Sequence, residues 1–232
     1  MSFSGMTSFW SRSFEEYRLI FGLTETDPAG LILGCADGPA SFNAEATASG
    51  HRVISCDPTY AYSATEFGRR VEACYDVVIS QVKENIEKYI WGYFRDPDQL
   101  GQYRLAAMRK FLADFDLGKQ AERYVIASLP ELPFKDDQFS LALVSHFLFL
   151  YSDEFDCDFH IAAFEELLRV AGEVRVFPLF GLDRHRSPHV GPVLDHLARV
   201  GFDVEVVSVE FVFQKVDDDT GNRMMRVLRR PA

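Results

Sequence analysis

The strongest constraint on the fold comes from residues 31–57, where an apolar strand, a glycine-bearing turn, a helix and a second strand follow one another directly. Leu31 to Gly38 has the sequence LILGCADG, in which apolar residues run straight into the turn. A helix is predicted over 39–49, since proline is tolerated in a first helical turn and Gly50 suits a helix end. The segment HRVISCD then predicts a second strand ending at Asp57. This unit implies a right-handed crossover between parallel strands, and hence an α/β protein.

Residues 61–123 interrupt this alternation. Two stretches within them, 62–94 and 99–115, are rich in charged and aromatic residues with helical spacing, and the sequence Asp-Pro-Asp at 96–98 predicts a turn between them. We interpret 61–123 as a helical insertion within a single domain that spans 1–232. As a hypothesis, it covers the carboxyl ends of the strands and gates a pocket there.

Strands and helices alternate again after the insertion. The apolar patterns predict strands over 124–128, 140–151 and 173–180, with helices over 155–170 and 192–200. The chain ends in two strand-like segments, 203–214 and 222–230, on either side of a turn-rich stretch, which predicts an antiparallel hairpin. Near the N-terminus, Trp10, Phe14, Tyr17 and Phe21 have the spacing of one apolar helix face.

Composition narrows the environment and the partners. The formal net charge is −11, which disfavours nucleic acid and anionic membranes as general partners. We find neither a signal-peptide pattern nor an apolar run of about 20 residues, so we expect a cytoplasmic protein with no membrane contact. The four cysteines lack the paired short spacings of a zinc site or a disulfide framework, which favours a reducing compartment.

Several of these segments together carry a family resemblance. LILGCADG, VISCDP, LPELPFKDDQFSLALVSHFLFLY, FEELLRVAGEVRVFPL and the closing hairpin resemble class I S-adenosylmethionine-dependent methyltransferases, over residues 30–230 apart from the insertion. The resemblance implies a Rossmann-like, doubly wound sheet of seven strands, with the last strand antiparallel beside the fifth. It also implies a ligand site at the carboxyl ends of the strands.

The resemblance assigns S-adenosylmethionine as cofactor and names the residues that would hold it. Gly34 and Gly38 match the family's glycine loop, and Asp57 matches the acidic residue that binds both ribose hydroxyls. Ser128 and Leu129 stand where the family contacts adenine. The full expected cofactor set is Gly34, Cys35, Ala36, Asp37, Gly38, Asp57, Pro58, Ser128, Leu129 and Ser145.

Catalytic side chains are harder to identify, because alignment of the acceptor does most of the work in methyl transfer. His146, at the end of the predicted strand 140–151, is our candidate general base. Ser145 precedes it, but successive strand residues point to opposite faces, so we expect no Ser–His dyad. No G-x-S-x-G elbow is present, and we predict no hydrolase. The cluster of His185, His189 and His196 lacks a second ligand pair, and we predict no metal.

We therefore predict methyl transfer from S-adenosylmethionine to a small-molecule acceptor. A non-catalytic binding or regulatory protein of the same fold is the alternative, because Ile32, Ala36 and Ser128 depart from the family's usual glycine and carboxylates. An NAD-dependent oxidoreductase is a third interpretation. It is disfavoured because Pro39 occupies the position at which the dinucleotide-binding motif needs its third glycine. Measured cofactor binding separates the three.

Overall fold

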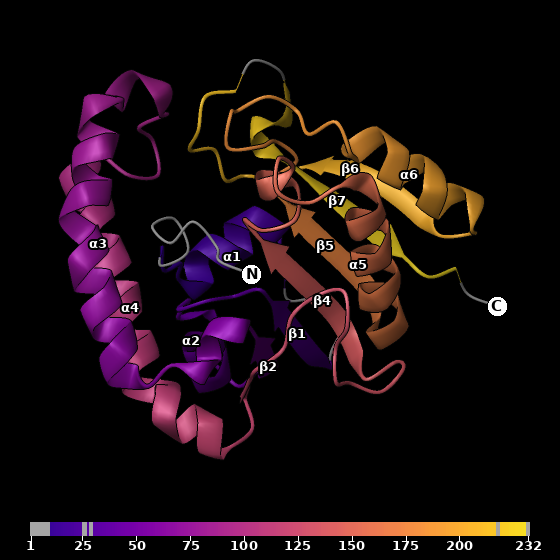
Figure 1. The fold of residues 1–232 in the computed structure, drawn as a ribbon, viewed down its shortest axis with the longest axis horizontal. Helices are drawn as coiled ribbons and strands as arrows, with labels where there is room; N and C mark the ends of the chain where they lie inside the picture. The colour runs from indigo at the N-terminus through magenta and orange to yellow at the C-terminus, as the bar shows by residue number, and fades with distance from the viewer. Residues whose placement is uncertain (1–9, 25–26, 28–29, 217–218, 231–232) are drawn as a thin grey trace.

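A single twisted sheet of seven strands organises the structure, a computed structural model that describes residues 10–24, 27, 30–216 and 219–230 (Figure 1). The strand order is β3-β2-β1-β4-β5-β7-β6. β1 to β5 are parallel, β7 runs antiparallel beside β5, and β6 pairs with β7. This confirms the predicted fold class. The strands are β1 (Leu31–Cys35), β2 (Arg52–Cys56), β3 (Tyr124–Val125), β4 (Phe139–Ser145), β5 (Ala171–Phe177), β6 (Asp203–Ser208) and β7 (Arg223–Leu228).

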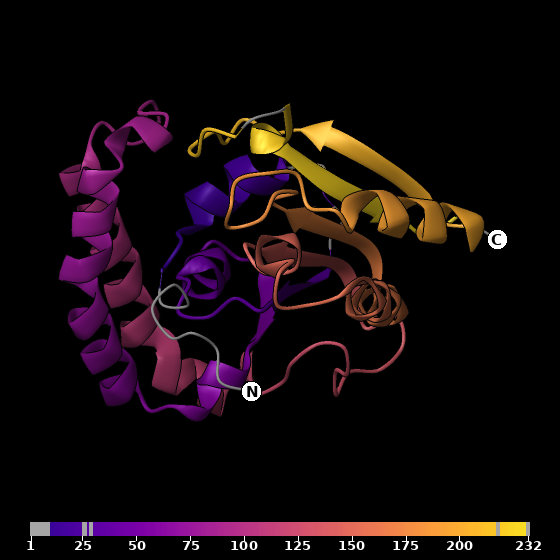
Figure 2. The same cartoon turned by 45° about the horizontal axis from the view of Figure 1, so that its top comes forward.

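Helices cover both faces of the sheet, which is why its central strands are apolar throughout. In β4, Leu141 and Leu143 face α1 (Phe14–Phe21) and α2 (Phe42–Ala48). Ala142 and Val144, which alternate with them, face α5 (Cys157–Val170) and α6 (Val190–Arg199). The central strands are thus buried between two helical layers (Figure 2). Their carboxyl ends are the edge at which open α/β sheets bind ligands.

The first helix begins later than its apolar spacing predicts. Ser13 caps α1 through a reciprocal pair of bonds: its hydroxyl accepts from the Glu16 amide, and the Glu16 carboxylate accepts from the Ser13 amide. Trp10 therefore precedes the helix instead of lying on its apolar face. The shift leaves residues 10–13 as a separate segment that packs beside the carboxyl ends of the strands.

Residues 61–123 contain two long helices, α3 (Ala64–Glu84) and α4 (Pro97–Gln120), with the short 3₁₀ turn η2 (Ile86–Lys88) between them. They run side by side along the margin of the molecule (Figures 1 and 2). Their own apolar cluster, which includes Phe67 and Phe111, reaches Tyr124 of β3. Because α4 leads directly into β3, this segment is also the crossover that joins β2 to β3.

Several predicted strands end earlier in the structure, among them the one predicted over 203–214, which ends at Ser208. β3 contains only Tyr124 and Val125, because it is an edge strand that pairs with two residues of β2. β4 ends at Ser145, since His146 takes a left-handed conformation with φ 54° and turns the chain into the 3₁₀ segment η3 (Phe149–Tyr151). The predicted closing hairpin is present as β6 and β7, although residues 217–218 of its turn lie outside the described part. Among the described helices, none is long and apolar enough to cross a membrane.

Candidate functional site

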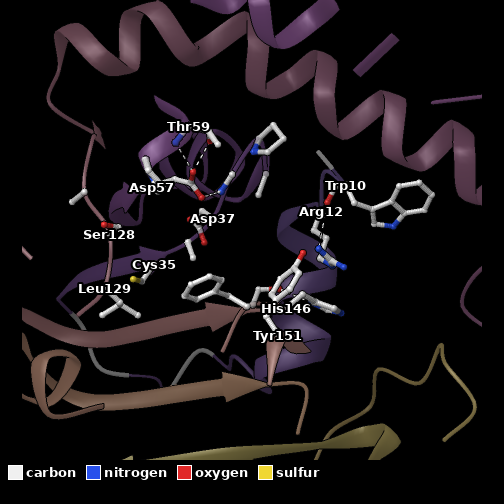
Figure 3. A pocket seen from close by; sticks show the side chains of 18 of the residues that line it. Trp10, Arg12, Cys35, Asp37, Asp57, Thr59, Ser128, Leu129, His146 and Tyr151 are labelled. Atoms are coloured by element: carbon white, nitrogen blue, oxygen red, sulfur yellow. Dashed lines mark hydrogen bonds between the residues drawn. The ribbon is translucent and has the colours of Figure 1, made fainter. Parts of the chain in front are cut away.

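A cavity of about 480 Å³ lies where β1, β2 and β4 end, at the edge that the topology predicts for a ligand (Figure 3). Of the predicted site residues, only Gly34 does not line it. Whether these residues contact a cofactor stays a prediction. Those that the fold brings together around the cavity are Cys35, Ala36, Asp37, Gly38, Asp57, Pro58, Ser128, Leu129, Ser145 and His146.

Gly34 has a different role from the one its motif implies. A Cβ built on Gly34 would stand 1.8 Å from Oδ2 of Asp37, so glycine is needed here to let the Asp37 side chain fold back. Farther along the loop, Ala36 and Gly38 have φ values of 56° and 51°, in the left-handed region that favours glycine. Ala36 therefore keeps the backbone conformation of a glycine loop, at a conformational cost of about 1–2 kcal/mol.

Asp37 is a buried carboxylate beneath the cavity, 8% exposed. It accepts hydrogen bonds from the hydroxyls of Tyr17 at 2.7 Å and of Ser55 at 2.6 Å. The pKa of Asp37 is raised to about 7, chiefly by burial and to a smaller extent by the nearby Asp57. The two hydrogen bonds act in the opposite direction and lower the pKa. Asp37 thus titrates near neutral pH, within reach of a ligand in the cavity.

Hydrogen bonds from the neighbouring loops fix the Asp57 carboxylate. Its Oδ2 accepts from the Gly38 amide at 2.8 Å, while Oδ1 accepts from the amide and the hydroxyl of Thr59. The side chain is 8% exposed, and burial raises its pKa despite these bonds. Asp57 is therefore a buried part of the loop structure and not an exposed residue at a strand end. Oδ2 retains the capacity to accept one more hydrogen bond.

Ser145 and His146 contact each other, contrary to the expectation from strand alternation. Ser145 Oγ and His146 Nδ1 lie 2.9 Å apart. The expectation was wrong because β4 ends at Ser145, and the left-handed backbone of His146 rotates the ring back toward its neighbour. Burial lowers the pKa of His146 well below its ordinary value, as do the nearby charges of Arg12 and Arg104. The imidazole is therefore neutral at pH 7, the form that can accept a proton.

The remaining predicted residues differ in what they offer a ligand. Ser128 and Pro58 are exposed at the rim, whereas Leu129 is buried and packs into the core. Cys35 is buried beside Cys56 on the neighbouring strand, where the Cys56 thiol and burial raise its pKa. We interpret Cys35 as part of the cavity floor, because a thiol with a raised pKa is a poor nucleophile.

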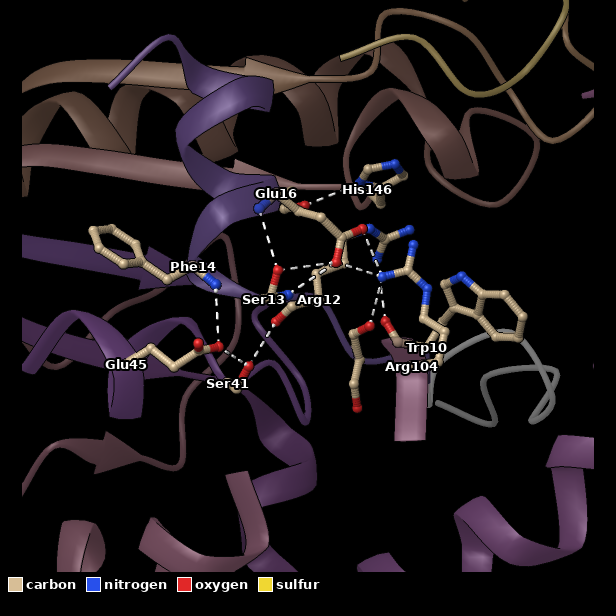
Figure 4. A network of polar contacts seen from close by, with 11 residues as sticks. Trp10, Arg12, Ser13, Phe14, Glu16, Ser41, Glu45, Arg104 and His146 are labelled. Atoms are coloured by element: carbon tan, nitrogen blue, oxygen red, sulfur yellow. Dashed lines mark hydrogen bonds and ion pairs between the residues drawn. The ribbon is translucent and has the colours of Figure 1, made fainter. Parts of the chain in front are cut away.

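Sequence reasoning missed the segment 10–13, which brings Trp10 and Arg12 to the cavity. A buried ion pair holds this segment in place: Arg104 of α4 lies 2.6 Å from the Glu16 carboxylate and donates to the Ser11 carbonyl at 2.8 Å (Figure 4). The S-x-x-E spacing of residues 13–16 is a signal for the helix start, and so for this segment, that the sequence does contain.

No metal centre is apparent within the described residues, where no three His, Cys, Asp or Glu side chains are grouped as ligands. Two of the histidines in the candidate cluster have other contacts. His189 Nε2 lies 3.2 Å from the Ser152 carbonyl, and His196 Nε2 lies 2.8 Å from the Glu165 carboxylate.

Comparison with known proteins gives one clear sequence relative. No family model matches the chain. The uncharacterized protein MJ0045 of Methanocaldococcus jannaschii is 28% identical over 220 residues, which cover 94% of each chain. The alignment spans nearly the whole of both proteins.

Solved structures with similar folds are far more distant in sequence. A TehB-like SAM-dependent methyltransferase from Corynebacterium glutamicum has a TM-score of 0.46 at 16% identity, covering 93% of this chain and 87% of that one. A SAM-dependent methyltransferase from Aquifex aeolicus has a TM-score of 0.42 at 14% identity, with coverage of 92% and 87%. The glycopeptide N-methyltransferase MtfA, complexed with sinefungin, has a TM-score of 0.44 at 10% identity, with coverage of 99% and 88%.

The sheet itself identifies the fold. Five neighbouring parallel strands, with the last strand of the chain antiparallel between β5 and β6, form the arrangement that the resemblance implied. The cavity lies at the carboxyl ends of β1, β2 and β4. This chain has the fold of the class I S-adenosylmethionine-dependent methyltransferases.

Proposed function

We propose that this protein transfers a methyl group from S-adenosylmethionine to a small-molecule acceptor. The observation that carries the proposal is the cavity of about 480 Å³ at the strand ends, into which the fold brings the glycine loop, Asp57 and the 128–129 segment together. These segments are far apart in the sequence, and the family motif requires them to meet at one ligand.

The residues of the cavity fit the proposed cofactor in charge and shape. Asp57 would accept a ribose hydroxyl through its remaining acceptor position, and Leu129 would offer an apolar contact to the adenine ring. Two carboxylates, Asp37 and Asp57, line the cavity, which suits a ligand that carries a cationic sulfonium and ammonium group. S-adenosylmethionine supplies an activated methyl group, so the protein needs chiefly to align the acceptor and exclude water.

His146 is the side chain best placed to take a proton from the acceptor. It lines this cavity and also an adjoining second one, and its imidazole is neutral at pH 7. With Nδ1 bonded to the Ser145 hydroxyl, Nε2 is the nitrogen left to face an acceptor. The lowered pKa makes His146 a weak base, which suits an acceptor whose own proton is readily lost.

A non-catalytic binding or regulatory protein of the same fold, which binds the cofactor weakly or not at all, is the second candidate. It is favoured by the hydrogen bonds that already engage Asp57 and by the hydroxyl of Ser128, which stands where a carboxylate is usual. If the wild type bound neither S-adenosylhomocysteine nor NAD, that result would support this alternative. Binding of NAD in place of S-adenosylmethionine would instead support the oxidoreductase.

Calorimetry with S-adenosylhomocysteine, the demethylated product, tests the proposal without knowledge of the acceptor. We expect micromolar-range binding to the wild type, and a loss of at least about tenfold for Asp57→Ala, because charge-assisted hydrogen bonds are worth about 1.5–3 kcal/mol. Since Asp57 also accepts bonds from Thr59, the variant is expected to lose stability as well.

The matched control is Thr59→Val, which removes one hydroxyl bond to Asp57 but keeps the carboxylate. It is expected to lower stability while retaining most of the affinity for S-adenosylhomocysteine. Equal affinity losses in both variants would show that the carboxylate acts only through the local fold. No binding of S-adenosylhomocysteine to the wild type would refute the proposed cofactor.

A further inference from the structure

A second cavity, of about 540 Å³, adjoins the first. Trp10, Arg12, His146 and Tyr151 line both, so they form the boundary between the two spaces. Each volume lies in the range of small-molecule sites, about 300–1,000 Å³. Two adjoining chambers with shared side chains suit a reaction between two ligands, one in each.

Aromatic side chains form much of the wall of the second cavity. Phe177 is the last residue of β5 and Phe180 follows that strand, while Phe211 and Phe213 follow β6. Tyr89 stacks on Phe213 with ring centroids 4.9 Å apart at an interplanar angle of 29°. Flat rings present flat contact surfaces, so this wall suits a planar, largely apolar molecule.

The far end of this cavity is built by residues that meet only in the folded chain. The Ile90 amide donates to the Phe213 carbonyl at 2.7 Å, and Tyr89 forms an isolated β-bridge with Gln214. From α3, Val78 and Val82 add apolar contacts. The helical segment 61–123 therefore contributes directly to this wall.

Arg12 is the one charged residue among the described residues that line the second cavity. Within the described part of the chain, its guanidinium makes one hydrogen bond, from Nη1 to the Trp10 carbonyl at 3.3 Å, and no ion pair, and its Nε is buried without a partner. The neighbouring Arg104, by contrast, is paired with Glu16. Burial lowers the pKa of Arg12 to about 10, so it stays charged at neutral pH.

The Arg12 guanidinium is half-buried, and the nearby Glu16 carboxylate that attracts it is already paired with Arg104. Such a partly desolvated charge is costly, and a bound anion would relieve that cost through charge-assisted bonds. The first cavity has its own carboxylates, Asp37 and Asp57, whereas no acidic side chain lines the second within the described residues. We propose that the second cavity binds a planar aromatic acid as the methyl acceptor, with its anionic group on Arg12. The role of this acid as methyl acceptor rests on the proposed function, whereas the acid-binding site itself does not.

Binding of 2-naphthoate and of its neutral amide, 2-naphthamide, to protein saturated with S-adenosylhomocysteine tests the charge preference. We expect the acid to bind at least about tenfold tighter than the amide, as one charge-assisted interaction would give. Arg12→Met should abolish the difference, and Arg18→Met, which removes an exposed arginine of α1, should keep it. Equal affinities for the two probes in the wild type would overturn the proposal.

The location is tested with adjacent residues of α3. Val78 lines the second cavity, whereas Val77 is 40% exposed and does not. Val78→Trp should weaken naphthoate binding by at least about tenfold while leaving S-adenosylhomocysteine affinity unchanged, and Val77→Trp should alter neither. Unchanged naphthoate binding in Val78→Trp would place the acid elsewhere.

Two further outcomes separate this inference from the proposed function. A loss of S-adenosylhomocysteine affinity in Arg12→Met, with naphthoate affinity unchanged, would assign Arg12 to the cofactor and refute our inference. If the wild type binds no S-adenosylhomocysteine but prefers naphthoate to naphthamide through Arg12, the proposed function fails while the acid site stands.

Discussion

Replacement of Asp37 by Asn should change how stability depends on pH. Burial raises the folded-state pKa of this carboxyl from 3.8 to about 7. Between those values the native state holds one proton that the unfolded chain has lost, so stability falls as pH rises. The slope is about 1.4 kcal/mol per pH unit for one proton, and over about three units the loss is about 4 kcal/mol. The contribution is fully present below pH 4 and is lost as pH rises through 7.

Asn fits the same site without a charge. Its carbonyl oxygen can accept from the Tyr17 hydroxyl, and its amide can donate to the Ser55 oxygen, so residue 37 keeps a hydrogen bond to each partner, with the Ser55 bond reversed in direction. The variant should therefore lack the pH-dependent contribution of residue 37 to the unfolding free energy, and the cost of the reversed Ser55 bond should be the same at every pH. We expect Asp37→Asn to be the more stable protein at pH 8, with an advantage that shrinks as the pH is lowered to 4.

Urea denaturation of both proteins at unit intervals from pH 4 to 8 measures this. The difference in unfolding free energy, variant minus wild type, should grow by about 4 kcal/mol over the range, while contributions of titrating groups that do not interact with residue 37 cancel. Asp76→Asn, at an exposed position of α3, is the control for loss of an acidic side chain outside the cavity. If the difference in unfolding free energy stays constant with pH, the inference that Asp37 is a buried carboxyl with a raised pKa is refuted.

Two further substitutions test the cavity's framework. Ala36→Gly should raise the unfolding free energy by about 0.5–1 kcal/mol, because relief of the left-handed alanine outweighs the extra chain entropy of glycine; a lower urea midpoint would contradict this. Arg104→Met should cost about 3–5 kcal/mol by leaving Glu16 buried without its partner. Adding Glu16→Gln, which keeps the helix cap, should restore part of that loss, and purely additive effects in urea denaturation would show that the pair is not coupled.

The sequence by itself determined the order and type of the main elements. The apolar strands, the glycine turn before 39–49 and the alternation after Tyr124 depend on local chemistry, since strand burial, helix capping and turn conformation are properties of neighbouring residues. A right-handed crossover then fixes β1 and β2 as parallel neighbours. Together with the family resemblance, the sequence also identified eleven site residues, of which ten line one cavity in the structure.

Only the tertiary structure decided how the site residues are held. That Gly34 makes room for Asp37, and that Ser145 contacts His146, depends on where a strand ends and how a side chain folds back. Arg12 was missed for the same reason: an ion pair between Arg104 and Glu16, 88 positions apart in the chain, carries its segment to the cavity. Local periodicity contains no information about such distant contacts, because they form only when α4 packs against the N-terminal segment.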